Sequence, residues 1–285
     1  RPDNGSALTT EVGRVAGMQA VVLDGEAFDA PALVLPSNAL TVAVWLRPVR
    51  MGSKNGNSGS VNGMIASSGS GYNDGWRLVV YDWKTRQPSV ELGREKGAFS
   101  VSASDSLSAG FWNHLAAPWD GARVRVYVNG MLSAEQPYDG QAVEPKSRLK
   151  LGFSGFGVGS LHMAADELAV FDRALPPEEV AALSLAGGAL AEPLKPLVRD
   201  VQLARVSRGA ASGLQSACRA LLQSPQATAG WRLWAGLAAA KHAASYEACA
   251  ALFENPALPA HLRGQAVEWL AQAVRKGSEL PSRVL

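Results

Sequence analysis

The spacing of the apolar residues changes near residue 190, and this change indicates two parts of different fold class. Before it, apolar and polar residues alternate in short segments, as in strands. After it, apolar residues recur every three or four positions, as in helices. Residues 1–198 hold 23 of the 29 glycines, whereas residues 199–285 hold 21 alanines and six glycines. We therefore predict an antiparallel β-sandwich jelly roll at 1–190 and a small all-α helical domain at 199–285. Between them, the two prolines of 191–198 predict an extended linker.

The clearest strand signal is ARVRVYV at 122–128, where Val124, Val126 and Val128 share one face. Asn129-Gly130 follows directly and is the signal for a tight hairpin turn. Similar short segments, separated by turn residues, occur at 19–24, 39–47, 75–82, 89–93, 111–117, 148–153 and 164–172. Many short strands without intervening helices are typical of a β-sandwich.

The last third of the chain predicts four or five helices separated by short breaks such as SPQ, NPALP and GSELP. Their order loosely resembles HEAT-type α-solenoid repeats, and a plain helical bundle is the alternative. The two cysteines, Cys218 and Cys249, lie in this region. They either pack as small apolar residues or form one disulfide.

Several spaced motifs of the first part resemble the laminin-G-like jelly roll of the concanavalin A-like lectin/glucanase superfamily. The resemblance covers about residues 10–190. It rests, in chain order, on LDGEAFDAPALVLPSNALTVAVWLRP, GWRLVV, FWNHLAAPWDGARVRVYVNG, KLGF and ADELAVFDRALPPEEVAAL. It implies an extracellular, cell-surface or periplasmic protein, and no signal peptide is present in this sequence.

The same resemblance implies one calcium ion as a cofactor. Carried over by position, its ligands are the carboxylate of Asp166 and backbone oxygens near Asp24 and Gly25. Calcium prefers hard oxygen ligands of this kind. The alternative is that Asp166 and Glu167 only accept hydrogen bonds from loop amides.

No catalytic constellation is found in the sequence. The glucanases of this superfamily use two carboxylates in an E-x-D-x-x-E pattern, because a retaining glycosidase needs its nucleophile and acid close together. The nearest strings, ELGRE and DELAVFD, do not fit this pattern. His114 stands in a W-x-H motif and is interpreted as a structural strand histidine. We therefore predict that the chain is not an enzyme, with a laminarinase-like glycoside hydrolase as the less favoured alternative.

Aromatic residues in or near turns are the candidate ligand-binding platforms. These are Tyr72, Trp83, Trp119, Tyr138 and Phe156. By contrast, Trp45, Trp76 and Trp112 lie inside strand motifs and are expected in the core.

The formal net charge of +2 gives no electrostatic reason to expect a nucleic-acid partner. No apolar run approaches the roughly 18 residues that a membrane-spanning helix needs. We expect a non-catalytic binding or adhesion protein, whose jelly roll recognises a glycan or a protein and whose helices mediate assembly. The alternative is a structural accessory subunit of a larger protein complex.

Overall fold

The chain forms two compact units, which are described separately. The computed structural model describes residues 9–14, 18–24, 27–29, 39–52, 63–69, 73–138, 148–152, 160–185, 190–207, 211–243 and 245–275. The first unit comprises residues 1–126 and 134–175, and the second comprises residues 127–133 and 176–285. The second unit therefore includes the tip of a β-hairpin as well as the helices.

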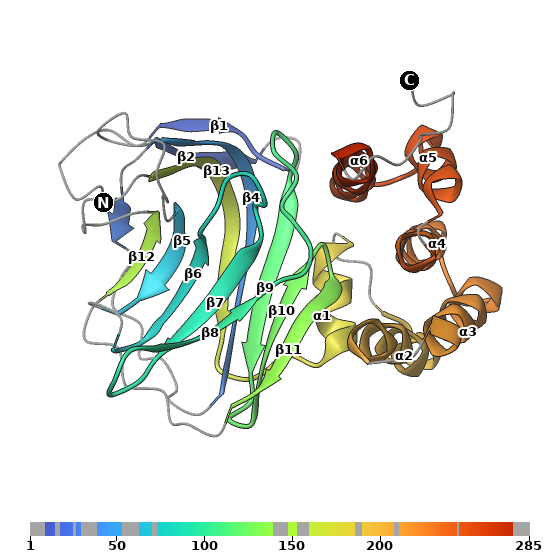
Figure 1. The fold of residues 1–285 in the computed structure, drawn as a ribbon, viewed down its shortest axis with the longest axis horizontal. Coiled ribbons are helices and arrows are strands. Elements are labelled where there is room, and N and C mark those ends of the chain that lie inside the picture. The colour runs from blue at the N-terminus through green and yellow to red at the C-terminus, as the bar shows by residue number, and fades with distance from the viewer. Residues whose placement is uncertain are drawn as a thin grey trace. The chain divides into compact units, whose positions relative to one another are not determined.

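The first unit is a sandwich of two antiparallel sheets, which confirms the predicted fold (Figure 1). The seven-stranded sheet has the order β1-β2-β13-β4-β9-β10-β11, and the six-stranded sheet has the order β3-β12-β5-β6-β7-β8. The strands are β1 (Thr10–Val12), β2 (Gln19–Asp24), β3 (Ala27–Asp29), β4 (Leu40–Gly52), β5 (Gly63–Ser68), β6 (Trp76–Val80), β7 (Pro88–Gly93), β8 (Ala98–Ser102), β9 (Asn113–Trp119), β10 (Arg123–Val128), β11 (Met131–Pro137), β12 (Leu149–Gly152) and β13 (Ser160–Phe171).

Aromatic side chains link the two sheets through the core of the sandwich. Trp119 of β9 lies edge-on to Tyr138, with ring centroids 5.9 Å apart. Tyr138 in turn packs on Phe99 of β8, at 4.8 Å between centroids. Because β9 belongs to one sheet and β8 to the other, this stack identifies the inner faces of both sheets.

The second unit contains the helices α1 to α6 and one short 3₁₀ helix. They are α1 (Pro177–Ser184), η1 (Glu192–Leu194), α2 (Lys195–Val206), α3 (Ala211–Gln223), α4 (Ala229–His242), α5 (Tyr246–Glu254) and α6 (Ala260–Arg275). From α1 to α6 each α-helix packs on the next, and α4 also contacts α6. This sequential packing is typical of α-solenoids. No described helix has both the length and the apolar character needed to cross a membrane.

The prediction of an extended linker at 191–198 is wrong, because η1 and the start of α2 occupy it. Pro193 and Pro196 lie in the first turns of their helices, where a missing backbone N–H costs no hydrogen bond. Leu194 and Val198 are buried in the helical core.

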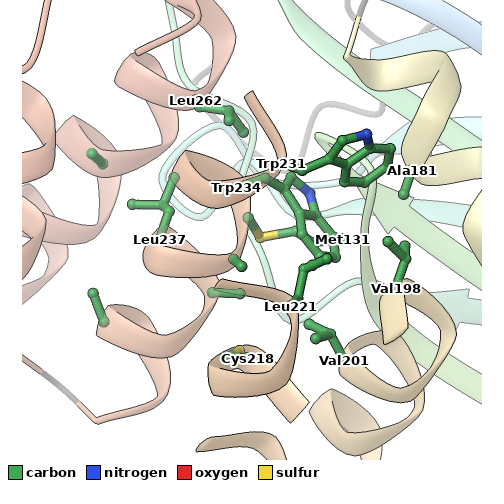
Figure 2. Packing of buried hydrophobic residues seen from close by; sticks show 14 of the residues in the cluster. Met131, Ala181, Val198, Val201, Cys218, Leu221, Trp231, Trp234, Leu237 and Leu262 are labelled. Carbon is green, nitrogen blue, oxygen red and sulfur yellow. The ribbon is translucent and has the colours of Figure 1, made fainter. Parts of the chain in front are cut away.

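The core of the second unit gathers around two tryptophans of α4 (Figure 2). Trp231 and Trp234 meet edge to face, with ring centroids 5.8 Å apart. Met131, from the hairpin tip, lies in the same cluster. The predicted alternative of a disulfide is wrong, because Cys218 on α3 and Cys249 on α5 are both free, buried thiols. They pack as small apolar residues, which was the other interpretation.

Polar side chains hold the hairpin tip among the helices. The buried Gln202 of α2 accepts a hydrogen bond from the Leu132 amide at 2.7 Å and donates one to the Gly130 carbonyl. Asn129 donates its side-chain amide to Gln265 of α6 at 2.9 Å. Asn129 and Gly130 have φ angles of 52° and 72°, which confirms the turn expected from Asn-Gly.

Candidate functional site

A row of polar side chains crosses one face of the six-stranded sheet. Each member lies directly opposite the next on the neighbouring strand, so their side chains point to the same side. In spatial order this polar row consists of Asp29, Lys150, Ser67, Arg77, Glu91 and Ser100.

The alternation of the strands places the polar row on the outer face of the sandwich. One position further along each strand, an apolar row runs parallel to the polar one and points to the opposite side. It consists of Phe28, Leu151, Ala66, Leu78, Val90 and Val101. Phe99, two residues from Val101 on β8, belongs to the aromatic stack in the core. The polar row therefore faces away from the core.

The four charged side chains of the polar row form two ion pairs. Arg77 and Glu91 lie 2.9 Å apart, and their side chains are only 7% and 6% exposed. The Tyr81 hydroxyl also donates to the Glu91 carboxylate. Burial raises the pKa of Glu91 above its ordinary value, while the Arg77 charge and hydrogen bond oppose this shift. Lys150 and Asp29 form the second pair, at 3.3 Å, and are partly exposed.

Hydroxyl groups extend the polar row along the sheet, and a tryptophan lies in the turn that follows β6. The Ser89 and Ser102 hydroxyls share a hydrogen bond of 2.7 Å, two residues along β7 and β8 from Glu91 and Ser100. Beyond Tyr81, the turn from β6 to β7 carries the partly exposed Trp83, whose ring lies 5.7 Å from the Arg86 guanidinium carbon. Carboxylates, cations and hydroxyls of this kind can hydrogen-bond the hydroxyl groups of a ligand, and an indole ring can stack on its apolar face.

Of the predicted aromatic platforms, Trp83 is partly exposed in the turn that follows β6. The predictions for Trp119 and Tyr138 are wrong, because these side chains are 2% and 1% exposed. The strand β9 continues to Trp119, and its register opposite Leu40 turns the indole into the core. Tyr72 and Phe156 lie outside the described residues.

The tryptophans expected in the core divide into two groups. Trp45 and Trp76 are buried, as predicted. Trp112 is partly exposed instead, with the Arg47 guanidinium 5.9 Å from its ring centroid.

The structure does not bring Asp24 to the Asp166 carboxylate. Asp24 of β2 lies opposite His162 of β13, which is four residues, or about 13 Å, from Asp166 along the strand. Gly25 lies outside the described residues. Asp166 accepts hydrogen bonds from the backbone amides of Arg14 at 3.1 Å and Glu167 at 2.9 Å.

These contacts match the alternative interpretation of Asp166, in which its carboxylate accepts hydrogen bonds from amides. Within the described ranges, no group of three or more His, Cys, Asp or Glu residues is placed to hold a metal ion. Calcium binding by this chain stays a prediction.

His114 lies in a buried cluster on the outer face of the seven-stranded sheet. Its ring centroid is 5.0 Å from that of Trp45, which is covered by the Arg14 guanidinium at 4.4 Å. Burial, and then the Arg14 charge, lower the pKa of His114 to about 3. The imidazole is therefore neutral at physiological pH, as expected of a structural strand histidine.

Sequence reasoning missed the polar row, although two of its members carried a signal. GWRLVV and PSVELG each place one charged residue, Arg77 or Glu91, in an otherwise apolar or small-residue strand. A charge in such a segment needs a partner when it is buried. The partner is identified only by the register between β6 and β7.

The two antiparallel sheets of the first unit form a jelly-roll β-sandwich. Residues 24–181, more than half of the chain, match the family described as the concanavalin A-like lectin/glucanases superfamily. The chain belongs to this family.

Comparison with known proteins adds one sequence relative and two solved structures of similar fold. The chain is 32% identical over 115 residues to pappalysin-1 of Mus musculus, a match that spans 36% of this chain and 7% of that protein. Domain 4 of AbnA, an extracellular arabinanase from Geobacillus stearothermophilus, was solved in complex with arabinotriose. It is similar in fold with a TM-score of 0.52 and 21% identity, over 63% of this chain and 82% of that one. The binding domain of Paraclostridial Mosquitocidal Protein 1 has a TM-score of 0.53 and 14% identity, over 64% and 46% of the two chains.

Proposed function

We propose that this chain is a non-catalytic carbohydrate-binding protein, and that the polar row binds a neutral oligosaccharide. The observation that carries the proposal is the charge balance of the row. Its two cations, Lys150 and Arg77, are paired with its two carboxylates, Asp29 and Glu91. The partly exposed Lys150 and Asp29 offer a donor and acceptors to hydroxyl groups, and the buried Arg77–Glu91 pair adds no net charge that would attract a polyanion.

The fold comparison supports the same class of ligand. The AbnA domain has this sandwich fold and was solved with a bound arabinotriose. That domain belongs to an extracellular enzyme, which favours a secreted or cell-surface location for this chain too. Arabinotriose is therefore a suitable first probe, within a panel of neutral oligosaccharides.

The spacing of the carboxylates supports a binding role rather than hydrolysis. Asp29 and Glu91 are separated by four strand-to-strand steps, or about 19 Å. Glycosidases place their two carboxyl groups about 5–9.5 Å apart. These two carboxylates are therefore too far apart to serve as a glycosidase pair.

The experiment is a binding screen of the intact chain against neutral oligosaccharides, with the variant Lys150→Ala. Removing one charge-assisted hydrogen bond is worth about 1.5–3 kcal/mol, so we expect affinity to fall at least tenfold. The control is Arg123→Ala on β10 of the other sheet, whose side chain is half exposed. It is expected to bind like the wild type.

The second candidate function is that of a structural subunit, in which the helical unit binds other proteins. It is favoured by the sequential packing of α1 to α6, since solenoids use extended surfaces for protein contacts. A screen without any oligosaccharide binding, together with stable protein partners on purification, would support this function and overturn the first.

A further inference from the structure

A pocket of about 200 Å³ lies between α4, α5 and α6. On α6, Trp269 and Ala273 are spaced at i and i+4 and so share the face that lines it. Cys249 of α5 and Ala240 of α4 line it from the neighbouring helices. All of these residues belong to the second unit, so the pocket is independent of the polar row.

The floor of the pocket, formed by these four side chains, is apolar. Trp269, Ala273, Cys249 and Ala240 are all at most 5% exposed. Burial raises the pKa of the Cys249 thiol to about 11, so this side chain is neutral at physiological pH. A charged group would lose its hydration against this floor, so the floor favours a neutral ligand.

The indole N–H of Trp269 is a buried hydrogen-bond donor in the wall of the pocket. Within the described part of the chain, no group accepts a hydrogen bond from this nitrogen. The Lys241 ammonium lies over the face of the same ring, 4.5 Å from its centroid, whereas the N–H donates from the ring edge. A buried donor without an acceptor is unfavourable, and a molecule that brings an acceptor into the pocket removes this cost.

The volume of the pocket limits the size of the ligand. An apolar cavity of about 150 Å³ can bind benzene, whereas pockets for drug-sized ligands have roughly 300–1,000 Å³. At about 200 Å³, this pocket suits one ring with a short substituent. Aromatic rings also pack favourably on an indole such as that of Trp269.

We propose that this pocket binds a small neutral aromatic molecule with one hydrogen-bond acceptor, such as an aryl ketone. Its ring would contact Ala240, Cys249 and Ala273, and its oxygen would accept a hydrogen bond from the Trp269 indole. Neither contact uses the charge of Lys241.

The intact chain is titrated with acetophenone and with ethylbenzene, which has nearly the same shape without the carbonyl oxygen. We expect acetophenone to move the indole N–H proton resonance of Trp269 downfield, and ethylbenzene to move it less. Benzoate, which has a charged carboxylate in place of the ketone, is expected to bind more weakly than acetophenone.

The decisive variant is Trp269→Phe, which keeps an aromatic ring and removes the donor. A neutral hydrogen bond is worth about fivefold in affinity, so we expect the ratio of acetophenone affinity to ethylbenzene affinity to fall about fivefold. The ratio is used because a change in packing affects both compounds. If this variant does not fold, the indole resonance of the wild type decides whether the hydrogen bond forms.

A second variant, Ala273→Met, tests the place of binding by filling the pocket. We expect it to weaken the binding of both compounds at least tenfold. The matched control is Ala271→Met, since Ala271 lies on the same helix, is partly exposed and is not among the lining residues. The proposal is overturned by no binding of either compound, by an unmoved indole resonance with acetophenone, or by tighter binding of benzoate than of acetophenone. An unchanged affinity ratio in folded Trp269→Phe or unchanged binding in folded Ala273→Met would also overturn it.

Discussion

His114 carries a pH dependence that follows from its burial. Its pKa is about 3 in the folded chain, because burial and the nearby Arg14 charge disfavour the imidazolium, and about 6.5 in an unfolded chain. Between these values the unfolded chain binds the extra proton and the folded chain does not. The stability that His114 contributes is therefore fully present above pH 6.5 and is lost as the pH falls toward 3.

We predict that the free energy of unfolding falls by roughly 2 kcal/mol between pH 7 and pH 5 because of His114 alone. Denaturant unfolding at the two pH values measures the loss in the wild type and in His114→Gln, whose amide does not titrate. Between pH 7 and pH 5, the variant should lose roughly 2 kcal/mol less stability than the wild type. Equal losses in both proteins would show that His114 titrates normally in the fold.

Removing one member of the buried Arg77–Glu91 pair should cost more stability than removing both. Arg77→Met leaves the buried Glu91 carboxylate without its cation, and the expected cost is about 3–5 kcal/mol. Arg77→Met with Glu91→Leu removes both charges, so the double variant should lose much less stability. Denaturant unfolding of the two single variants and the double variant measures the coupling. Additive losses would contradict a direct pairing.

At the scale of single elements, the hairpin turn between β10 and β11 can be tested by comparing Gly130 with a control glycine, Gly97. Gly130 has φ of +72°, and an added Cβ would lie 2.0 Å from the Ser184 hydroxyl of α1. Gly97 has φ of +84° and nothing within 4 Å of such a Cβ. Gly97→Ala therefore suffers only the left-handed strain of about 1–2 kcal/mol, whereas Gly130→Ala adds a steric overlap.

We expect Gly130→Ala to be the less stable variant by at least about 1 kcal/mol in thermal or denaturant unfolding. The overlap is with a buried side chain, because Ser184 is 0% exposed and donates to the Ala181 carbonyl. Equal stability of the two variants would mean that the hairpin tip is not held against α1.

The sequence predicted the strands and helices whose residue pattern can be recognised within one short segment. Alternating valines and Asn129-Gly130 located β10 and its turn, and the periodic apolar residues located the helices beyond residue 199. The strand β5, with the sequence GMIASS, was missed because small residues give no clear alternation. The helical start of α2 was missed because proline disfavours a helix interior but not a first turn.

The candidate site was less predictable, because its members meet only through register between strands. Asp29, Ser67 and Glu91 are far apart in sequence, and nothing local assigns them to one row. Trp119 was misplaced for a related reason, since a residue beside the Asp120-Gly121 turn can still point into the core. Trp83 was placed correctly near the surface because its turn holds it there.

At the scale of the whole molecule, the chain combines a lectin-like sandwich with a helical unit of sequentially packed helices. The hairpin tip 127–133 belongs to the helical unit, so the second unit is built from two separate stretches of chain. The candidate site, the balanced polar row, lies on the sandwich.

The measurement that tests the polar row most directly is a chemical-shift map of the intact chain with a bound neutral oligosaccharide. We predict shifts at the Trp83 indole N–H and at the amides of Arg77, Glu91 and Ser100, with the indole of the buried Trp119 unchanged. Shifts confined to residues of the seven-stranded sheet or of the helices would contradict the central claim.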